Sequence, residues 1–397
     1  MRFVTIFSIL CFLGGPLAAQ SKPSLDSNVV LQVTIAGNQQ EFHIGETIPL
    51  SLSFKTTVKG AYEVNMAQYD RGGRMNYERF VVSPSDGAID PLPTNAGSMG
   101  GITGYQFLTP EPWTIKLNLN EWIRFTRPGE YRLVVTSNRV SARDRSNPLG
   151  ASPVTAHSNE IVLKIVPANA AWQRQVYDEA VAVLDARAPA QREQMEKYTA
   201  SRRQAIETLR FLGTADATRE LAKRMRGEDC GGLDYLCMLG LISSPERAVA
   251  RSALEEALAD PDHPIDSNFL YTLRMLNSEP GIGNANWREE NQRAVEQLVA
   301  ALPVKRGNAL SVSLATALAQ AWDLAALPKE TTDKLIGQLT SMFDQLPLKE
   351  QNTLLTFRWN KIASPAMLPI LRRYAQSYRD FPEMREVTTY ESLSLSG

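Results

Sequence analysis

The chain has 397 residues, and 42 Lys and Arg stand against 43 Asp and Glu, for a formal net charge of −1. Such a balance gives no long-range attraction to nucleic acid or to an anionic membrane. It therefore argues against proteins that bind these polyanions through a large net positive charge. The length leaves room for two or three domains, each burying its own core.

Residues 1–19 have the pattern of a secretion signal peptide. Arg2 gives a positive start, residues 3–13 are apolar, and Ala18 and Ala19 are the small residues expected before a cleavage site. The apolar run is about half of the roughly 20 residues that a membrane span needs. We expect cleavage after Ala19, an exported protein in the periplasm or outside the cell, and no membrane span afterwards. An uncleaved anchor is the alternative.

Residues 25–167 are predicted to form β-strands. Turn signals recur about every ten residues, which is typical of a β-sandwich. Pro49 predicts that its strand lies at a sheet edge, and residues 142–158 are expected to be an irregular crossing. Apolar and polar residues alternate, as in half-buried strands, over 31–35, 48–54, 62–66, 77–82, 115–119, 131–135 and 161–165.

One motif identifies the kind of sandwich. The arrangement Phe125-x-x-Pro128-Gly129-x-Tyr131-x-Leu133 resembles the corner of immunoglobulin-like sandwiches, where a Tyr at the start of a strand hydrogen-bonds to upstream backbone. The resemblance implies an N-terminal immunoglobulin-like β-sandwich.

The segment 83–109 interrupts the strand pattern. Its prolines and glycines argue against a regular element, so we expect a long loop that is either functional or a plain insertion. Ser98 lies in Gly97-Ser98-Met99-Gly100, but no strand-to-helix context surrounds it, so a nucleophile is not expected. Tyr105, Trp113 and Trp122 are interaction candidates, either as a carbohydrate-binding surface or as packed residues.

After Pro167 the periodicity becomes helical, which predicts an all-α domain over 170–397. The run Pro245-x-x-Ala248-x-x-x-x-Ala253-Leu254-x-x-Ala257-Leu258-x-Asp260-Pro261-Asp262-x-Pro264-Ile265 resembles one HEAT-type repeat. It departs from that family at Asp266, where a basic residue is usual. The resemblance implies an α-solenoid, a scaffold whose curved face binds a partner. The end of the chain fits either a truncated terminus or a frayed one.

No constellation of residues predicts catalysis, a metal or a cofactor. The three histidines, His43, His157 and His263, are isolated in the sequence. Asp260, Asp262, His263 and Asp266 suit either calcium or helix capping. The acids Glu228, Asp229, Asp234, Glu289 and Glu290, and the basic residues Arg202, Arg203 and Arg210, are interpreted as solvated surface.

Cys230 and Cys237 remain after removal of the signal. In an oxidising compartment they are a candidate disulfide, although two helical turns would place them about 10 Å apart. The bond requires Gly231 and Gly232 to keep Cys230 off the helix. The alternative is two packed thiols.

Three functions are therefore open. The first is an exported, non-catalytic binding or scaffold protein whose partner is another envelope or secreted protein. The second is an exported hydrolase with its site in the loop 83–109 or at the domain junction. The third is a protease inhibitor that uses the same loop.

Overall fold

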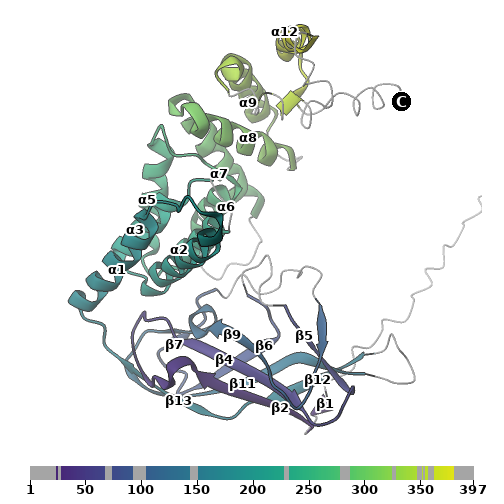
Figure 1. The fold of residues 1–397 in the computed structure, drawn as a ribbon. Coiled ribbons are helices and arrows are strands. Elements are labelled where there is room, and N and C mark those ends of the chain that lie inside the picture. Colours follow the sequence, from purple (N-terminus) through teal and green to yellow (C-terminus); the bar gives the residue numbers. More distant parts are fainter. Residues whose placement is uncertain are drawn as a thin grey trace, which may run out of the picture.

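The structure is a computed structural model, and it describes residues 24–25, 28–67, 74–92, 104–143, 151–227, 232–277, 287–323, 328–346, 351, 354–355 and 362–379. Within these residues the strands come first and the helices follow. The last strand ends at Val166 and the first α-helix begins at Ala170. Figure 1 shows the strands gathered at one end of the molecule and the helices leading away from them.

The longest strand, β11 (Gly129–Arg143), organises the larger sheet, whose strand order is β1-β12-β11-β13-β3. Its first half pairs with β13 and β6, and its second half pairs with β12 and β5. The register shifts between Ser137 and Val140, where the partners change. This sheet is mixed, because β1 and β3 join it in parallel. Its other strands are β1 (Ser24–Leu25), β3 (Glu41–His43), β5 (Tyr62–Asn65), β6 (Glu78–Ser83), β8 (Tyr105–Phe107), β12 (Ala151–His157) and β13 (Ile161–Val166).

A second, antiparallel sheet has the order β2-β4-β9, formed by β2 (Val29–Ile35), β4 (Pro49–Thr56) and β9 (Trp113–Asn118). A two-stranded ribbon pairs β7 (Ala88–Ile89) with β10 (Arg124–Phe125). Alternate residues of the two larger sheets, such as Leu52, Leu133 and Leu163, are fully buried in one shared core.

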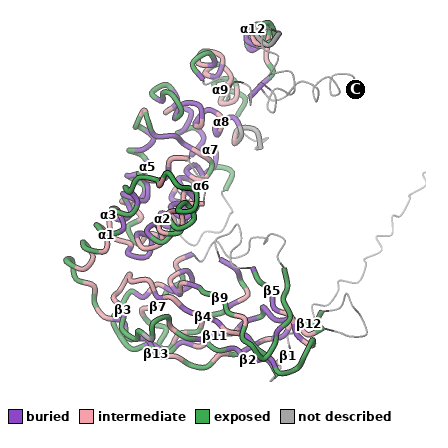
Figure 2. Tube along the Cα trace, in the orientation of Figure 1, coloured by how far each residue is buried: buried purple, intermediate pink, exposed green. Residues whose placement is uncertain are grey.

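The helices follow one another along the chain from α1, beside the strands, to α12 at the far end (Figure 1). Their inward faces form a second core, and Figure 2 shows the buried residues concentrated where neighbouring helices meet. The α-helices are α1 (Ala170–Asp185), α2 (Arg192–Leu212), α3 (Ala215–Arg224), α4 (Leu233–Ile242), α5 (Arg247–Ala259), α6 (Ser267–Asn277), α7 (Trp287–Ala301), α8 (Gly307–Asp323), α9 (Lys329–Met342) and α12 (Leu368–Arg379). Short 3₁₀ turns are η1 (Ala36–Asn38), η3 (Leu119–Glu121), η5 (Leu302–Val304), η6 (Phe343–Gln345) and η7 (Pro365–Met367).

Several strand predictions were wrong in detail. Pro49 begins β4, which is the central strand of its sheet rather than an edge strand. A first position tolerates proline because the ladder starts there. The irregular crossing predicted for 142–158 contains the end of β11 and all of β12. The loop 83–109 contains the short strands β7 and β8, and its residues 93–103 lie outside the described part.

The predicted corner is present in its contacts. Tyr131 donates its hydroxyl hydrogen toward the carbonyl of Arg127, at 3.0 Å, with the carbonyl of Asp86 at 3.3 Å. Its ring lies 4.6 Å from that of Phe125. The chain passes here from β9 in the small sheet to β11 in the large one.

Candidate functional site

A groove of about 420 Å³ lies between the outer edges of β2 and β13. No described strand pairs with the outer side of β2, whose partner is β4. β3 covers the outer side of β13 from Lys164 to Val166, and no described strand covers the residues before it. The groove is lined by Gln32, Val33, Thr34, Ile35, Gln39, Gln40, Asn159, Glu160, Ile161 and Val162.

The side chain of Asn159 already occupies one position of this edge. Its Oδ1 accepts a hydrogen bond from the Val33 N–H at 2.8 Å, and its Nδ2 donates to the Val33 carbonyl at 3.1 Å. A residue of a neighbouring antiparallel strand makes the same pair of bonds. Because strand residues alternate, Leu31 and Ile35 direct their main-chain groups to the same side as Val33.

The chemistry of the groove suits an extended polypeptide. Open strand edges bind such segments through main-chain hydrogen bonds. Among the lining residues Glu160 carries the one charge, and Arg132 pairs with it at 2.8 Å. The other polar walls are amides and a hydroxyl, so shape and hydrogen bonding outweigh charge. The volume lies within the roughly 300–1,000 Å³ usual for ligand sites.

A second polar region joins the strands to the helices, and we call it the junction. Arg210 of α2 donates from Nη1 and Nη2 to the two carboxylate oxygens of Glu121, at 2.7 and 2.5 Å. These side chains are only 1% and 2% exposed. Breaking a buried pair of this geometry leaves an uncompensated charge, which strongly disfavours separation of the two parts.

Other contacts surround this ion pair. Asn118 donates to a carboxylate oxygen of Glu207 at 3.0 Å. Burial, followed by the nearby Glu121 carboxylate, raises the pKa of Glu207. His43 stacks on Trp172 of α1 with ring centroids 4.5 Å apart, and its Nδ1 lies 3.1 Å from the carboxylate of Glu46.

The first stretch of the loop 83–109, as far as Leu92, also belongs to the junction. Arg74 forms two hydrogen bonds with Asp90, at 2.8 and 2.5 Å, and another with the Glu121 carbonyl at 2.7 Å. The Asp90 carboxylate also accepts from the Leu92 N–H at 2.8 Å. Leu92 is 1% exposed and packs in the core of the helices. This part of the loop therefore anchors the strands to the helices.

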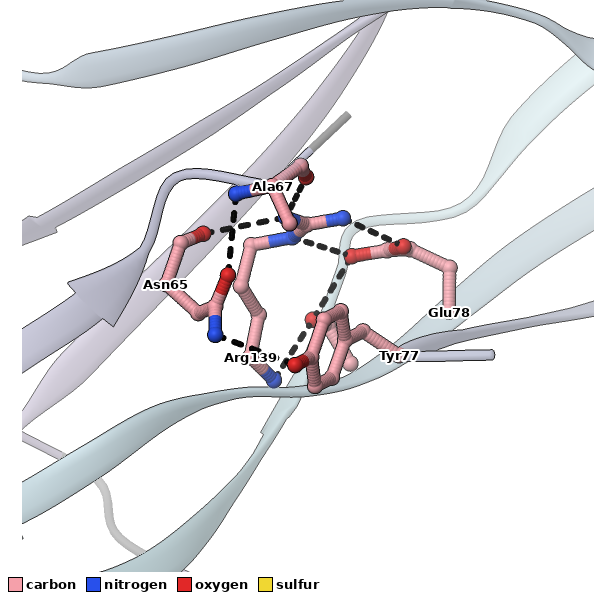
Figure 3. Close-up of polar contacts among 6 residues, drawn as sticks. Asn65, Ala67, Tyr77, Glu78 and Arg139 are labelled. Atoms are coloured by element: carbon pink, nitrogen blue, oxygen red, sulfur yellow. Dashed lines mark hydrogen bonds and ion pairs between the residues drawn. The ribbon is translucent and has the colours of Figure 1, made fainter. Parts of the chain in front are cut away.

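A third polar cluster lies wholly inside the strand region (Figure 3). Arg139, at the register shift of β11, donates from Nε and Nη2 to the two carboxylate oxygens of Glu78, at 2.7 and 2.8 Å. Its Nη1 donates to the carbonyls of Asn65 and Ala67. Both charged side chains are fully buried. Because their groups are satisfied within the fold, the cluster is a structural element.

The three aromatic interaction candidates do not share one exposed surface. Trp122 is 9% exposed and its ring lies 4.7 Å from that of Phe80. Trp113 is partly buried, 5.9 Å from Phe54. Tyr105 on the edge strand β8 is 57% exposed. Packing therefore accounts for both tryptophans.

The predicted disulfide joins one described residue, Cys237, to Cys230. Cys237 is fully buried on α4, and Cys230 lies outside the described residues. The helix begins at Leu233, after Gly232 with a φ of 75°. The condition that Cys230 stay off this helix is thus compatible with the start of α4, and the disulfide remains a prediction.

The acidic turn at 260–266 connects helices. Asp266 accepts a hydrogen bond from the Phe269 N–H at 2.8 Å, at the start of α6, and Asp262 pairs with Arg306 at 2.5 Å. His263 has its Nε2 2.7 Å from the carbonyl of Met225. Lys305 donates to the carbonyls of Ala257, Asp260 and His263. The carboxylate and carbonyl oxygens of this turn are therefore engaged in helix capping and in contacts between helices.

Two of the acids predicted to be solvated surface are buried: Asp234 is 4% exposed and Glu290 is 9% exposed. Ser98, Glu228 and Asp229 lie outside the described residues, while Glu290 pairs with Arg293 at 3.0 Å. Within the described part of the chain, no group of three or more His, Cys, Asp or Glu could hold a metal ion. No helix there is both long and apolar enough to cross a membrane.

Sequence reasoning missed the residues that define these sites. Arg210 was interpreted as part of a basic surface, but it is buried against Glu121, 89 residues earlier in the chain. Asn159 lies in the connection between β12 and β13, where the sequence has no motif. A polar residue on the apolar side of α2, next to Leu209, Phe211 and Leu212, was the one signal for Arg210.

No protein-family model matches the chain, and no curated protein matches it significantly.

Proposed function

We propose that this is an exported, non-catalytic binding or scaffold protein in which an immunoglobulin-like sandwich is fixed to a HEAT-like helical solenoid. The Tyr131 corner and the core shared by two sheets support the first part. The consecutive stacking of helices around one core supports the second. The partner is another envelope or secreted protein.

The sandwich edge is the proposed partner site. The observation that carries this proposal is the Asn159 carboxamide, which makes strand-like hydrogen bonds to Val33 beside the groove. A partner strand would extend this pattern to the main-chain groups of Leu31 and Ile35. Recognition would rest on main-chain bonds, with the polar groove walls selecting the side chains.

The junction supports the scaffold role rather than the hydrolase alternative. Its cavity has a volume of only about 10 Å³, which is space for roughly one water molecule. Residues 83–92 of the loop 83–109 are committed to Arg74 and to the helical core through Asp90 and Leu92. This stretch is therefore not free to enter a protease.

Proline at Ile35 tests the edge directly. Ile35 has extended backbone with a φ of −93°, from which a modest adjustment reaches the roughly −65° of proline, and its N–H points away from β4. Ile35→Pro therefore removes one donor from the groove while the ladder to β4 stays intact. The control is Ile35→Val, which keeps the donor.

The measurement uses peptides selected from a displayed library against the full mature chain. We expect their affinity, measured by calorimetry, to fall at least about tenfold with Ile35→Pro and to stay unchanged with Ile35→Val. N-methylation of alternate peptide nitrogens should weaken binding similarly. Peptides that bind all three proteins equally, or a library that yields no groove binder, would contradict the proposed site.

A further inference from the structure

The junction holds one arginine without a counter-ion. The main chain of Arg124 on β10 pairs with Ile89, but its guanidinium forms no hydrogen bond or ion pair with any residue that the structure describes. The two other arginines there are neutralised, Arg74 by Asp90 at 2.5 Å and Arg210 by Glu121 at 2.5 Å. The junction therefore has a surplus positive charge at Arg124.

Arg124 lies at the wall of the 10 Å³ cavity, which has residues of both parts of the molecule around it. The strand part contributes His43 and Asn120, and the helices contribute Arg210, Phe211 and Ser243. The volume admits about one atom or group of water size.

The neighbouring acceptors are already in use. Asn120 accepts from the Ile48 N–H at 2.7 Å and donates to the Glu46 carbonyl at 2.9 Å. The Glu46 carboxylate accepts from the His43 N–H and from Gln39. No carboxylate of the described lining therefore remains to neutralise Arg124.

This environment is unfavourable for a lone guanidinium. Burial, and then the charge of Arg210, lower the pKa of Arg124 to about 10. Arginine stays protonated at neutral pH even so. A partly desolvated cation of this kind is stabilised by an anion that pairs with it.

We propose that this cavity is an anion-binding site that takes one small monovalent anion, a halide or one oxygen of a carboxylate group, against Arg124. The guanidinium supplies the donors, and Arg210 adds positive potential from the helical side. Because the walls come from strands and helices, the anion stabilises the attachment of the two parts. This site goes beyond the proposed partner groove and does not depend on it.

The test measures thermal stability of the full mature chain at constant ionic strength, replacing the bulky anion gluconate with chloride or with formate. Binding to the folded state alone raises the Tm with anion concentration, along a saturating curve. We expect a rise of about 2–4 °C for the wild type. Chloride and formate arms distinguish a halide from a carboxylate.

Two variants of Arg124 should differ in their response to the anions. Arg124→Gln should have a higher Tm than the wild type in gluconate, because the unpaired charge is gone, and should lose the response to both anions. Arg124→Lys keeps the charge and should retain a weaker response. The matched control is Arg127→Gln, three residues further on, where the arginine is 65% exposed and paired with Asp86; it should respond as the wild type does.

Each of these measurements either supports or overturns the anion site. An equal chloride or formate response in Arg124→Gln and the wild type overturns the proposal, as does a wild type with the same Tm in all three salts. If Arg124→Gln does not fold, loss of the response in Arg124→Lys relative to Arg127→Gln still supports it, and an undiminished response there overturns it.

Discussion

At the scale of single residues, the structure places charges where most proteins place apolar groups. Arg139 with Glu78, and Arg210 with Glu121, are buried pairs in which both carboxylate oxygens are bonded. Such pairs add little net stability over apolar residues, yet removing one partner is strongly destabilising. They therefore specify which segments meet: Arg139 joins β11 to residues 65, 67 and 78, and Arg210 joins α2 to η3.

A buried histidine makes stability depend on pH. His263 is 3% exposed, and burial, the largest effect, lowers its pKa from 6.5 to about 4. Arg226 and Lys305 also lower the pKa, whereas the Met225 carbonyl and Asp260 raise it. The folded state keeps the ring neutral while the unfolded chain takes up a proton below pH 6.5, so stability present above that pH is lost as the pH falls toward 4.

The variant for this prediction is His263→Gln, which can still donate to the Met225 carbonyl. Between pH 6.5 and 4 the wild type should lose up to about 3 kcal/mol more unfolding free energy than the variant. Urea unfolding across this range measures the difference. Parallel pH profiles for the two proteins would show that His263 is not the group responsible.

At the scale of elements, a tight turn between β3 and β4 is fitted to the end of α2. Gly45 has a φ of 86°, and a Cβ built there would lie 3.1 Å from the carbonyl oxygen of Leu212. Gly37 has a φ of 71° but has open space around it. The two glycines share the backbone requirement, and only Gly45 has the close approach.

Alanine variants of these two glycines separate the cost of backbone strain from the cost of the close contact with α2. Gly37→Ala should cost about 1 kcal/mol because of its positive φ, and Gly45→Ala should cost about 1–3 kcal/mol more because α2 must move. Urea unfolding measures both. Equal costs for the two variants would mean that the turn can move away from α2 without a penalty.

The elements also show what the sequence could predict. Half-buried strands such as β2 and β9 were found because alternation follows directly from one buried face. The elements that were missed include β12 and α4. In β12, Ala, Ser, Pro and Thr give weak alternation, and α4 is apolar nearly all round, so no helical stripe distinguishes it. The groove proposed to bind a partner depends on Asn159 meeting β2 across 126 residues, which no local pattern indicates.

At the scale of the whole molecule, the junction should couple the unfolding of the strands to that of the helices. Arg210→Ala leaves Glu121 buried without its partner, and we expect a loss of about 3–5 kcal/mol. We also expect the single unfolding transition to divide into two, since each part has its own core. Calorimetry together with tryptophan fluorescence follows both parts, because Trp122 and Trp172 belong to different ones.

The control for the junction is Arg219→Ala on α3. Arg219 pairs with Asp216 on the surface, where the two side chains are 57% and 60% exposed, so its loss should change stability by less than about 1 kcal/mol. An Arg210→Ala protein that keeps the wild-type midpoint and one transition would contradict the coupling.

The fixed junction has a geometric consequence for any pair of ligands. If a second ligand bound the helices, a fixed span would separate it from a molecule held beside Asn159, because the buried Arg210–Glu121 pair joins α2 to the strands. This span then sets the distance between the two ligands. Targets with a matching spacing gain avidity because both sites bind at once, and targets with another spacing gain none. The protein would then hold its two ligands at a fixed spacing.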